Sequence, residues 1–234
     1  MNANGRSVFI TGGGSGLGAA VARRLAQAGW RVALAGRRQA PLTQVSDELR
    51  AAGANVVAYA LNVTDAAAVE RALHAFKPDA LVCCAAILGQ GTAFDALTPQ
   101  RFAEVHAINV GGTFNVCSAA MRLWRESGVQ GDIVTVSSLG GIRGMQKFPG
   151  FAAYASSKHA VVGLTEALAI DGRAHGIRVN CVAPGTMRTA MVAELGLTPS
   201  TRPEQIAPTV EFLLNRALSG VVTGTTVEIH CNDD

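Results

Sequence analysis

The sequence predicts an α/β protein in which a doubly wound parallel sheet carries helices on both faces. Three observations predict this fold class. Short apolar runs alternate with amphipathic stretches along the chain, the runs are apolar on both faces, and a glycine-rich segment follows the first run. Strands that are apolar on both faces need a layer of helices on each side, which is the arrangement of a mostly parallel sheet.

The first half of the chain alternates strand and helix patterns. Apolar residues between Leu17 and Ala28 are spaced as on one face of a helix, and Thr64 or Asp65 can cap a later helix. The predicted strands are Ser7–Thr11, Arg31–Ala35, Asn55–Ala60 and Asp79–Cys84. The predicted helices are Leu17–Ala28, Pro41–Ala52 and Ala66–Phe76.

The second half continues this alternation with longer helices. The predicted helices are Pro99 to about Glu126, Tyr154 to about Ala174, and Pro203–Leu218. The predicted strands are Asp132–Ser137, Gly176–Ala183 and Thr225–His230. Because parallel crossovers are right-handed, these elements predict a Rossmann-type sheet of about seven strands, with its site at the carboxyl ends of the strands. At 234 residues the chain is expected to form one domain, residues 1–234.

The composition excludes several classes of protein. Apolar residues make up 49% and charged residues 16%, which excludes a disordered chain. The net charge is +3 and the basic residues are scattered, so neither nucleic acid nor a membrane surface is an expected partner. No apolar segment precedes the first motif and none reaches ~18 residues, so neither a secretory signal nor a membrane helix is expected.

The cysteines indicate a cytoplasmic protein. There are five of them, an odd number, and their spacing fits neither a disulfide framework nor a zinc site. His230 and Cys231 are adjacent metal-ligand types without further partners, so no metal is expected.

Glycine is enriched, with 26 residues, or about 11% against a usual value of about 7%. Five of them lie in Gly12–Gly18, between the first predicted strand and the first predicted helix. Glycine lets the backbone approach a phosphate closely, and a helix N-terminus attracts negative charge. This strand–turn–helix context predicts dinucleotide binding, whereas a tight turn without a ligand is the alternative. The predicted contacts are Gly12, Gly14, Ser15, Gly16, Leu17 and Gly18.

The end of the second predicted strand bears on the choice of dinucleotide. An acid there would bond the ribose 2′-hydroxyl of NAD, whereas an arginine suits the 2′-phosphate of NADP. The sequence has Gly36 followed by Arg37, which predicts NADP, with NAD as the second choice. The alternative is that Arg37 and Arg38 bind no cofactor and only form the solvent-exposed start of the next helix.

Tyr154 and Lys158 open a predicted helix and share one of its faces, because residues four apart lie one turn above each other. The pKa of free tyrosine is about 10, and a neighbouring ammonium together with a bound nicotinamide cation is expected to lower it. Such a tyrosine could pass a proton to or from a carbinol oxygen during hydride transfer. A chance pair on a helix surface is the alternative, but the chain has only two tyrosines.

Together these motifs resemble the short-chain dehydrogenase/reductase family, and within it the 3-oxoacyl thioester reductases. The resemblance spans nearly the full chain, with the motifs in the family's order. It is carried by Thr11-Gly12-x3-Gly16-x-Gly18, Asn109 in Ile108-Asn109-Val110, Ser138 after the fifth strand, Tyr154-x3-Lys158, and Pro184-Gly185-x3-Thr189.

The resemblance implies an NADP-dependent oxidoreductase that interconverts a small ketone or aldehyde with an alcohol, assembled as a homotetramer or homodimer. Tyr154 would be the catalytic acid/base, and Ser138 would bond the substrate oxygen. Lys158 would bond the nicotinamide ribose and lower the pKa of Tyr154. Asn109 would kink its helix and hold a water that relays protons. The implied cofactor contacts are Gly12, Gly14, Ser15, Gly16, Leu17, Gly18, Arg37, Asn62, Val63, Ala85, Tyr154, Lys158, Pro184, Gly185 and Thr189.

Several alternatives stay open. The protein could instead be an NAD-dependent alcohol dehydrogenase of the same family, or a catalytically idle dinucleotide-binding protein. Ser137 could take the place of Ser138, and Thr189 could be only a loop cap.

Two departures from the family pattern lie near the predicted adenosine. Asn62-Val63 stands in place of Asp-Val, and Asn62 is still expected to contact adenine. The fourth strand ends in Cys84-Ala85-Ala86, where the family has Asn-Ala-Gly. The added methyl of Ala86 is expected to disturb packing beside the ribose.

Two further departures lie in loops. The segment from Ser138 to Tyr154 is longer than usual in the family, with the surplus placed in 144–148. The segment from Thr189 to Pro203 is shorter, which predicts an open pocket, a bulky or tethered substrate, or cover from a neighbouring subunit. These loops and residues 88–94 are expected to set specificity, and the sequence does not reveal the substrate.

Overall fold

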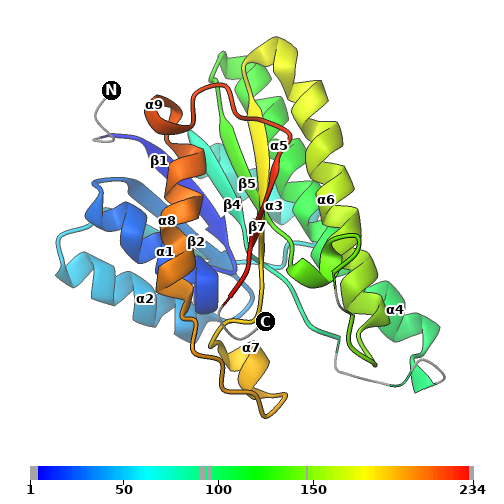
Figure 1. Ribbon diagram of the computed structural model, residues 1–234. Coiled ribbons are helices and arrows are strands. Elements are labelled where there is room, and N and C mark those ends of the chain that lie inside the picture. The colour runs from blue at the N-terminus through cyan, green and yellow to red at the C-terminus, as the bar shows by residue number, and fades with distance from the viewer. Residues whose placement is uncertain (1–4, 90–92, 94–95, 146, 232–234) are drawn as a thin grey trace.

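The structure is a computed structural model that describes residues 5–89, 93, 96–145 and 147–231. The described residues form a parallel sheet of seven strands in the order β3-β2-β1-β4-β5-β6-β7, which confirms the predicted doubly wound α/β fold (Figure 1). Each predicted strand is present within two residues of its predicted ends. The strands are β1 (Ser7–Thr11), β2 (Arg31–Gly36), β3 (Val56–Ala60), β4 (Ala80–Cys83), β5 (Asp132–Val136), β6 (Arg178–Pro184) and β7 (Thr226–Ile229).

Helices connect the strands. Asp65 caps α3 by accepting a hydrogen bond from the backbone N–H of Ala68. The helices are α1 (Gly16–Gln27), α2 (Gln39–Ala51), α3 (Ala66–Phe76), α4 (Pro99–His106), α5 (Gly112–Ser127), α6 (Ala152–Gly172), α7 (Ala190–Ala193), α8 (Pro203–Leu214) and α9 (Arg216–Ser219).

Two helices predicted as continuous are interrupted. A π-helical turn, Ala107–Gly111, separates α4 from α5. The helix predicted over Pro203–Leu218 ends at Leu214, because Asn215 has an extended backbone and its side chain caps α9. Each interruption lies at an asparagine whose side chain forms specific hydrogen bonds, Asn109 in the first and Asn215 in the second. The helical spacing of apolar residues does not predict these bonds.

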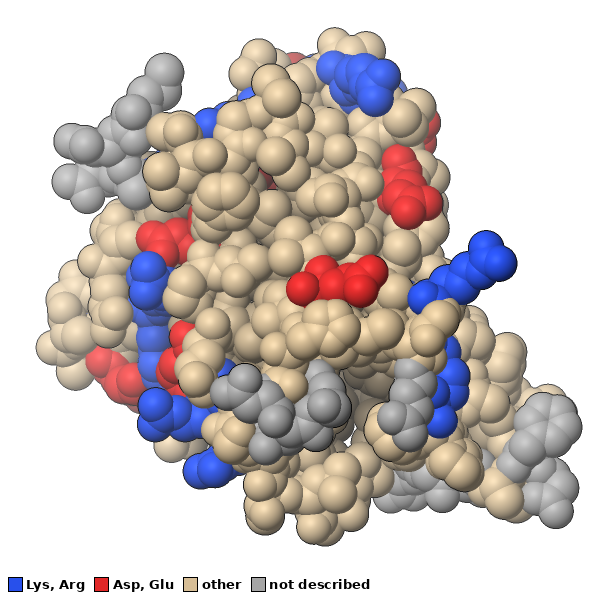
Figure 2. Space-filling view, in the orientation of Figure 1, with Lys and Arg blue, Asp and Glu red and all other residues tan. Residues whose placement is uncertain are grey.

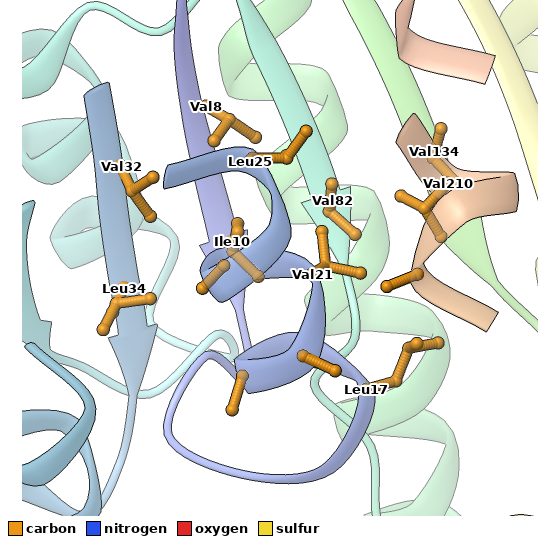
Figure 3. Close-up of a cluster of buried hydrophobic side chains, with 14 of the residues drawn as sticks. Val8, Ile10, Leu17, Val21, Leu25, Val32, Leu34, Val82, Val134 and Val210 are labelled. Atoms are coloured by element: carbon orange, nitrogen blue, oxygen red, sulfur yellow. The ribbon is translucent and has the colours of Figure 1, made fainter. Parts of the chain in front are cut away.

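The helices form one layer on each face of the sheet, with α1, α2 and α8 on one side and α3, α5 and α6 on the other (Figure 1). Figure 3 shows side chains of α1, among them Val21 and Leu25, lying over the strands β1, β2 and β4. Val8 and Ile10 of β1 point to this layer, while Phe9 points to the opposite layer. The alternation explains why the strands carry apolar residues on both faces.

The strand order fixes the position of the site. β1 pairs with β2 on one side and with β4 on the other, so the connections that leave β1 and β4 diverge to opposite faces. A crevice forms where the strand order reverses, outside the carboxyl ends of the strands. The same edge carries α7, and the space-filling view is recessed there, at the lower edge of the molecule (Figure 2).

A buried carboxylate, Asp132, lies at the amino end of β5 and bonds three arginines. Its oxygens accept hydrogen bonds from Arg6 at 2.7 Å, Arg178 at 2.8 Å and Arg216 at 3.0 Å. Asp132 and Arg178 are both buried, and Arg6 and Arg178 also donate to carbonyl oxygens at the end of α8. This arginine cluster ties α8 and α9 to the sheet edge opposite the crevice.

Acidic and basic side chains lie beside one another on the face that α1, α2 and α8 cover (Figure 2). Arg23 of α1 pairs with Glu48 of α2, and Arg24 pairs with Glu211 of α8. Within the part of the chain that the structure describes, no helix is both long enough and apolar enough to cross a membrane.

Candidate active site

A cleft of about 1360 Å³ opens at the carboxyl ends of the strands. It brings together every predicted site residue except Asn109, which is buried behind its wall. The predicted residues that line it are Gly12, Gly14, Ser15, Gly16, Leu17, Gly18, Arg37, Asn62, Val63, Ala85, Ser138, Tyr154, Lys158, Pro184, Gly185 and Thr189. Among the described residues, no group of three His, Cys, Asp or Glu side chains is arranged to hold a metal ion.

The glycine loop between β1 and α1 has room for backbone only. Gly12 has a positive φ of 68°, and a Cβ there would lie 2.9 Å from the backbone carbon of Cys84. A Cβ on Gly18 would lie 2.4 Å from the carbonyl oxygen of Gly12. Ser15 starts α1 without a side-chain capping bond, so the first N–H groups of the helix face the cleft. This cradle fits a pyrophosphate, as predicted for a dinucleotide site.

Replacing Gly18 with alanine is expected to weaken cofactor binding. The new methyl meets backbone atoms of Gly12 that cannot rotate away, so the loop must shift. A lost charge-assisted hydrogen bond costs about 1.5–3 kcal/mol, which corresponds to about tenfold or more in the Kd for NADPH. Fluorescence titration measures this change.

Gly163→Ala is the matched control for this substitution. Gly163 lies on the exposed side of α6, and a Cβ there meets no atom within 4 Å. Alanine at such a helical position should leave NADPH binding unchanged and stabilise the protein by about 0.5–1 kcal/mol. Equal Kd values for the two variants would contradict the steric account of the loop.

Arg37 follows Gly36 at the rim of the cleft, at the end of β2. Its side chain is exposed, and within the described residues it makes no ion pair or hydrogen bond. A Cβ on Gly36 would approach only the Leu42 side chain, at 3.6 Å. The structure therefore has space for an acidic side chain at position 36. Packing does not explain why this sequence has glycine there in place of an acid.

The adenosine end of the cleft contains Asn62 and Val63. Asn62 is exposed, and its Oδ1 accepts a hydrogen bond from the backbone N–H of Thr64 at 3.2 Å, which leaves its amide N–H groups available. Val63 is buried against Gly112, where a Cβ would lie only 2.4 Å from the valine side chain. The close approach of α5 explains a glycine that the sequence alone did not single out.

Ala86 causes no backbone strain, and its effect on packing beside a bound ribose stays a prediction. Ala86 lines the cleft and is half-buried. Among the described residues, Lys77 is the only one other than glycine with a positive φ, so the Ala86 methyl sits on an unstrained backbone. Next to it, the backbone N–H of Ala85 donates to Thr11 Oγ1 at 3.2 Å, which joins the ends of β4 and β1.

Ser138, Tyr154 and Lys158 meet at the centre of the cleft. Tyr154 hydrogen-bonds Ser138, and Lys158 Nζ lies 5.6 Å from the centroid of the Tyr154 ring. The Lys158 ammonium donates to the carbonyl oxygen of Val136 at 2.8 Å. Ser137 is buried, and its hydroxyl donates to the backbone of α6. This arrangement supports Ser138 as the hydroxyl that faces a substrate.

The pKa of Tyr154 is shifted in the direction opposite to the one expected. Burial raises it, and the hydrogen bond from Ser138 opposes the rise only in part. Burial also lowers the pKa of Lys158 to about 8, against the influence of Cys181 and Cys84. Lys158 is not among the causes of this shift, so the expectation that Lys158 and a bound nicotinamide lower the Tyr154 pKa stays a prediction for the complex with the cofactor. A tyrosine that holds its proton at neutral pH is suited to donate one.

Asn109 lies in the π-helical turn and connects three segments of the chain. Its Oδ1 accepts from the backbone N–H of Ile87 at 2.8 Å, and its Nδ2 donates to the Ile87 carbonyl and to Ser157 Oγ, both at 3.0 Å. Ser157 in turn donates to the carbonyl oxygen of Tyr154 at 2.7 Å. The side chain of Asn109 thus holds α6 in place, and its part in a proton relay stays a prediction.

Sequence reasoning missed Ser157, and it placed Gly141 at the predicted cofactor and substrate mouth without a reason for glycine at that position. Ser157 precedes Lys158 and is completely buried, but a serine in a helix gives no signal of its own. A Cβ on Gly141 would lie 2.6 Å from the backbone of Lys158, so the turn after β5 needs glycine to approach α6. Ser157 lies in α6 and contacts Asn109 of the π-helical turn, and Gly141 contacts Lys158 of α6, so the role of each depends on a tertiary contact.

The loops at the mouth of the cleft are described in part. Thr189 caps α7, since its Oγ1 accepts from the backbone N–H of Val192 at 3.3 Å. A Cβ on Gly16 would lie 3.4 Å from the Thr189 side chain, which places this cap beside the glycine loop. Of the predicted specificity loops, residues 90–92, 94 and 146 lie outside the described residues.

Known proteins are similar to this chain in sequence and in fold. Residues 6–199 match the family described as short chain dehydrogenase. The A-factor type gamma-butyrolactone 1'-reductase (1S-forming) of Streptomyces virginiae is 35% identical, over 96% of this chain and 93% of its own. A short chain dehydrogenase from Mycobacterium paratuberculosis bound to NAD has a TM-score of 0.88 and 30% identity, covering 98% of this chain and 97% of that one. A 3-oxoacyl-[acyl-carrier protein] reductase from Brucella melitensis with bound NAD has a TM-score of 0.86 and 29% identity, covering 98% and 91%.

The chain belongs to the short-chain dehydrogenase/reductase family, which confirms the resemblance seen in the motifs. The relatives are dehydrogenases and reductases, so the protein is an oxidoreductase that acts on alcohol and carbonyl groups. Family members bind NAD or NADP.

Proposed function

We propose that the protein is an NADP-dependent oxidoreductase that interconverts a ketone or aldehyde with the corresponding alcohol, using Tyr154 as acid/base. The observation that carries this proposal is the meeting of Tyr154, Ser138 and Lys158 in the same cleft as the glycine loop. Residues 1–234 work as one domain in this proposal.

The bound nicotinamide supplies the hydride, and the chain supplies position and a proton. Residues Gly12–Gly18 hold the pyrophosphate against the N-terminus of α1. Ser138 bonds the substrate oxygen and keeps it beside the Tyr154 hydroxyl. Tyr154 gives its proton to that oxygen during reduction and takes it back during oxidation. Lys158 holds the nicotinamide ribose and places a positive charge beside the phenol.

The preference for NADP rests on Arg37. Its guanidinium is exposed at the cleft rim, unpaired within the described chain, and follows a strand end that has no acid. The structures of relatives from Mycobacterium paratuberculosis and Brucella melitensis hold NAD, so NAD is the second choice.

Replacing Arg37 with alanine is expected to weaken NADPH binding by about 10- to 100-fold. A charged hydrogen-bonded pair contributes about 1.5–3 kcal/mol. NADH lacks the 2′-phosphate, so it makes no such pair with Arg37 and loses nothing when the arginine is replaced. NADH binding should therefore change by less than about twofold. Titration of both cofactors measures the difference.

The control for this substitution is Arg71→Ala, on the exposed side of α3 and away from the cleft. It should change neither affinity. Equal or tighter binding of NADH than NADPH by the unmodified protein would contradict the assignment of NADP.

An NADPH-oxidation screen over ketones, acyl thioesters, quinones and sugars tests the activity itself. Turnover of at least one carbonyl class is expected. A protein that binds no nicotinamide cofactor in fluorescence titration would refute the proposed function. Cofactor binding without any turnover would favour the idle dinucleotide-binding alternative.

Self-association as a homotetramer or homodimer is part of the proposal. It is supported by large apolar side chains exposed on the helices that flank Asn109 and Tyr154, namely Phe102 of α4, Phe114 of α5 and Ile170 of α6.

A further inference from the structure

The substrate end of the cleft has two apolar walls. One wall comes from the segment before α6 and contains Met145, Phe148 and Phe151. The other wall surrounds α7 and contains Met191, Leu195 and Leu197. Ser138 and Tyr154 lie in the same cleft, so a group attached to a reacting carbonyl would extend between these walls.

Apolar surface is left uncovered at this mouth. Phe148 is 60% exposed and Leu197 is 51% exposed, and they belong to opposite walls. Exposed apolar side chains that line a cleft are typical of a binding site, because a ligand removes them from water.

Phe151 is the aromatic side chain closest to the predicted proton donor. Its ring stands edge-on to the ring of Tyr154, with 6.5 Å between the centroids. Phe151 immediately precedes α6, so the start of the helix fixes its position relative to Tyr154. The substituent next to the carbonyl carbon would therefore contact Phe151.

Charges at the substrate end offer little to an anionic substrate beyond the Lys158 ammonium, which the proposed function assigns to the nicotinamide ribose. The two arginines among the described lining residues, Arg37 and Arg38, lie at the other end of the cleft. Lys147 lines the mouth, but its ammonium donates to the carbonyl oxygens of Ile142 and Met145, at 2.6 Å and 2.8 Å. The carboxylate of Glu194 also lines this end and would repel an anion.

We propose that the substrate is an uncharged ketone, or its secondary alcohol, with a bulky apolar substituent that lies between the two walls against Phe151. This inference rests on the proposed function, because it places the reacting carbonyl at Tyr154. It excludes keto acids and phosphate-bearing thioesters as preferred substrates.

Four ketones test the inference with NADPH at saturation. They are 2-butanone, cyclohexanone, 2-decalone and 4-oxocyclohexanecarboxylate. Each buried methylene contributes about fourfold, so kcat/KM should rise from 2-butanone to cyclohexanone and by at least about tenfold from cyclohexanone to 2-decalone. For 4-oxocyclohexanecarboxylate, kcat/KM should be at least about tenfold lower than for cyclohexanone. Its charged carboxylate would have to give up its hydration water in an apolar site, which costs free energy.

Phe151→Ala should reduce the ratio of kcat/KM for 2-decalone over cyclohexanone by about tenfold. Phe151→Leu, which keeps an apolar wall, should restore part of that ratio. The matched control is Phe212→Ala, which removes a ring that is 42% exposed on α8 and does not line the cleft. Melting curves show whether each variant is folded.

Binding to the Tyr154→Phe variant with NADPH present separates this inference from the proposed function. Saturation-transfer NMR measures this binding. If 2-decalone binds more tightly than the carboxylate but the unmodified protein turns over neither compound, the result would support the inference and refute the function. Turnover that favours the carboxylate or an acyl thioester would overturn the inference and leave the function standing. Absence of any binding of 2-decalone would also overturn it.

Discussion

Tyr154→Phe is expected to lower kcat by about 10²- to 10⁴-fold, because it removes the proposed proton donor and nothing else. The ring itself stays, so its edge contact with Phe151 and its position near the Lys158 ammonium are retained. The Kd for NADPH should change little, since the glycine loop and Arg37 are untouched. Steady-state kinetics together with fluorescence titration separate the two effects.

The chain offers a matched control for this substitution, because it has only two tyrosines. Tyr59 lies in β3, where its ring packs against Phe9 with 5.8 Å between the centroids. Tyr59→Phe makes the same chemical change away from the cleft and should leave kcat within about twofold. A Tyr154→Phe variant that retained more than about a tenth of the activity would remove Tyr154 from the mechanism.

Asp132→Asn is expected to lower the free energy of unfolding by about 3–5 kcal/mol, because it leaves buried Arg178 without a counter-charge. Total stabilities of domains are about 5–15 kcal/mol, so this loss is a large fraction. The amide can still accept a hydrogen bond, but it carries no charge for the three arginines. Urea denaturation measures the change, and the midpoint should fall while the slope stays constant.

Asp47→Asn is the control for the charge change. Asp47 forms an exposed pair with Arg50 on α2, where the side chains are 63% and 48% exposed. Exposed pairs of this kind contribute about 0.2–1 kcal/mol, so its loss should be small. If both variants lost the same stability, the buried cluster would contribute no more than a surface pair.

The fold could largely be predicted, because its strands can be recognised in the sequence as short apolar runs. Ser7–Thr11 is a short run between glycines with an apolar centre, Val8–Ile10, and the structure places β1 at the same residues. The interruptions could not be predicted in this way. The π-helical turn at Asn109 follows from the bonds of its side chain to Ile87 and Ser157, which are distant in sequence.

The site residues with special chemistry could be predicted, whereas those with ordinary side chains could not. Tyr154 and Lys158 stood out by type and spacing, and the structure brings them together. Ser157 has no such signal, since a serine in a helical pattern is common. Phe151 lies in a loop that was predicted to set specificity, but the sequence does not show that its ring contacts Tyr154. The direction of the Tyr154 pKa shift also escaped prediction, because burial is a property of the assembled cleft.

The arginine cluster around Asp132 bears on the order in which the chain can fold. Arg6 lies 126 positions before Asp132, and Arg216 lies 84 positions after it. Contacts between such distant residues slow folding, and synthesis delivers the N-terminal part first. A growing chain that has completed β5 but not α8 and α9 therefore holds the Asp132 carboxylate with only part of its partners. The sheet edge opposite the cleft is therefore completed only after almost the whole chain has been synthesised.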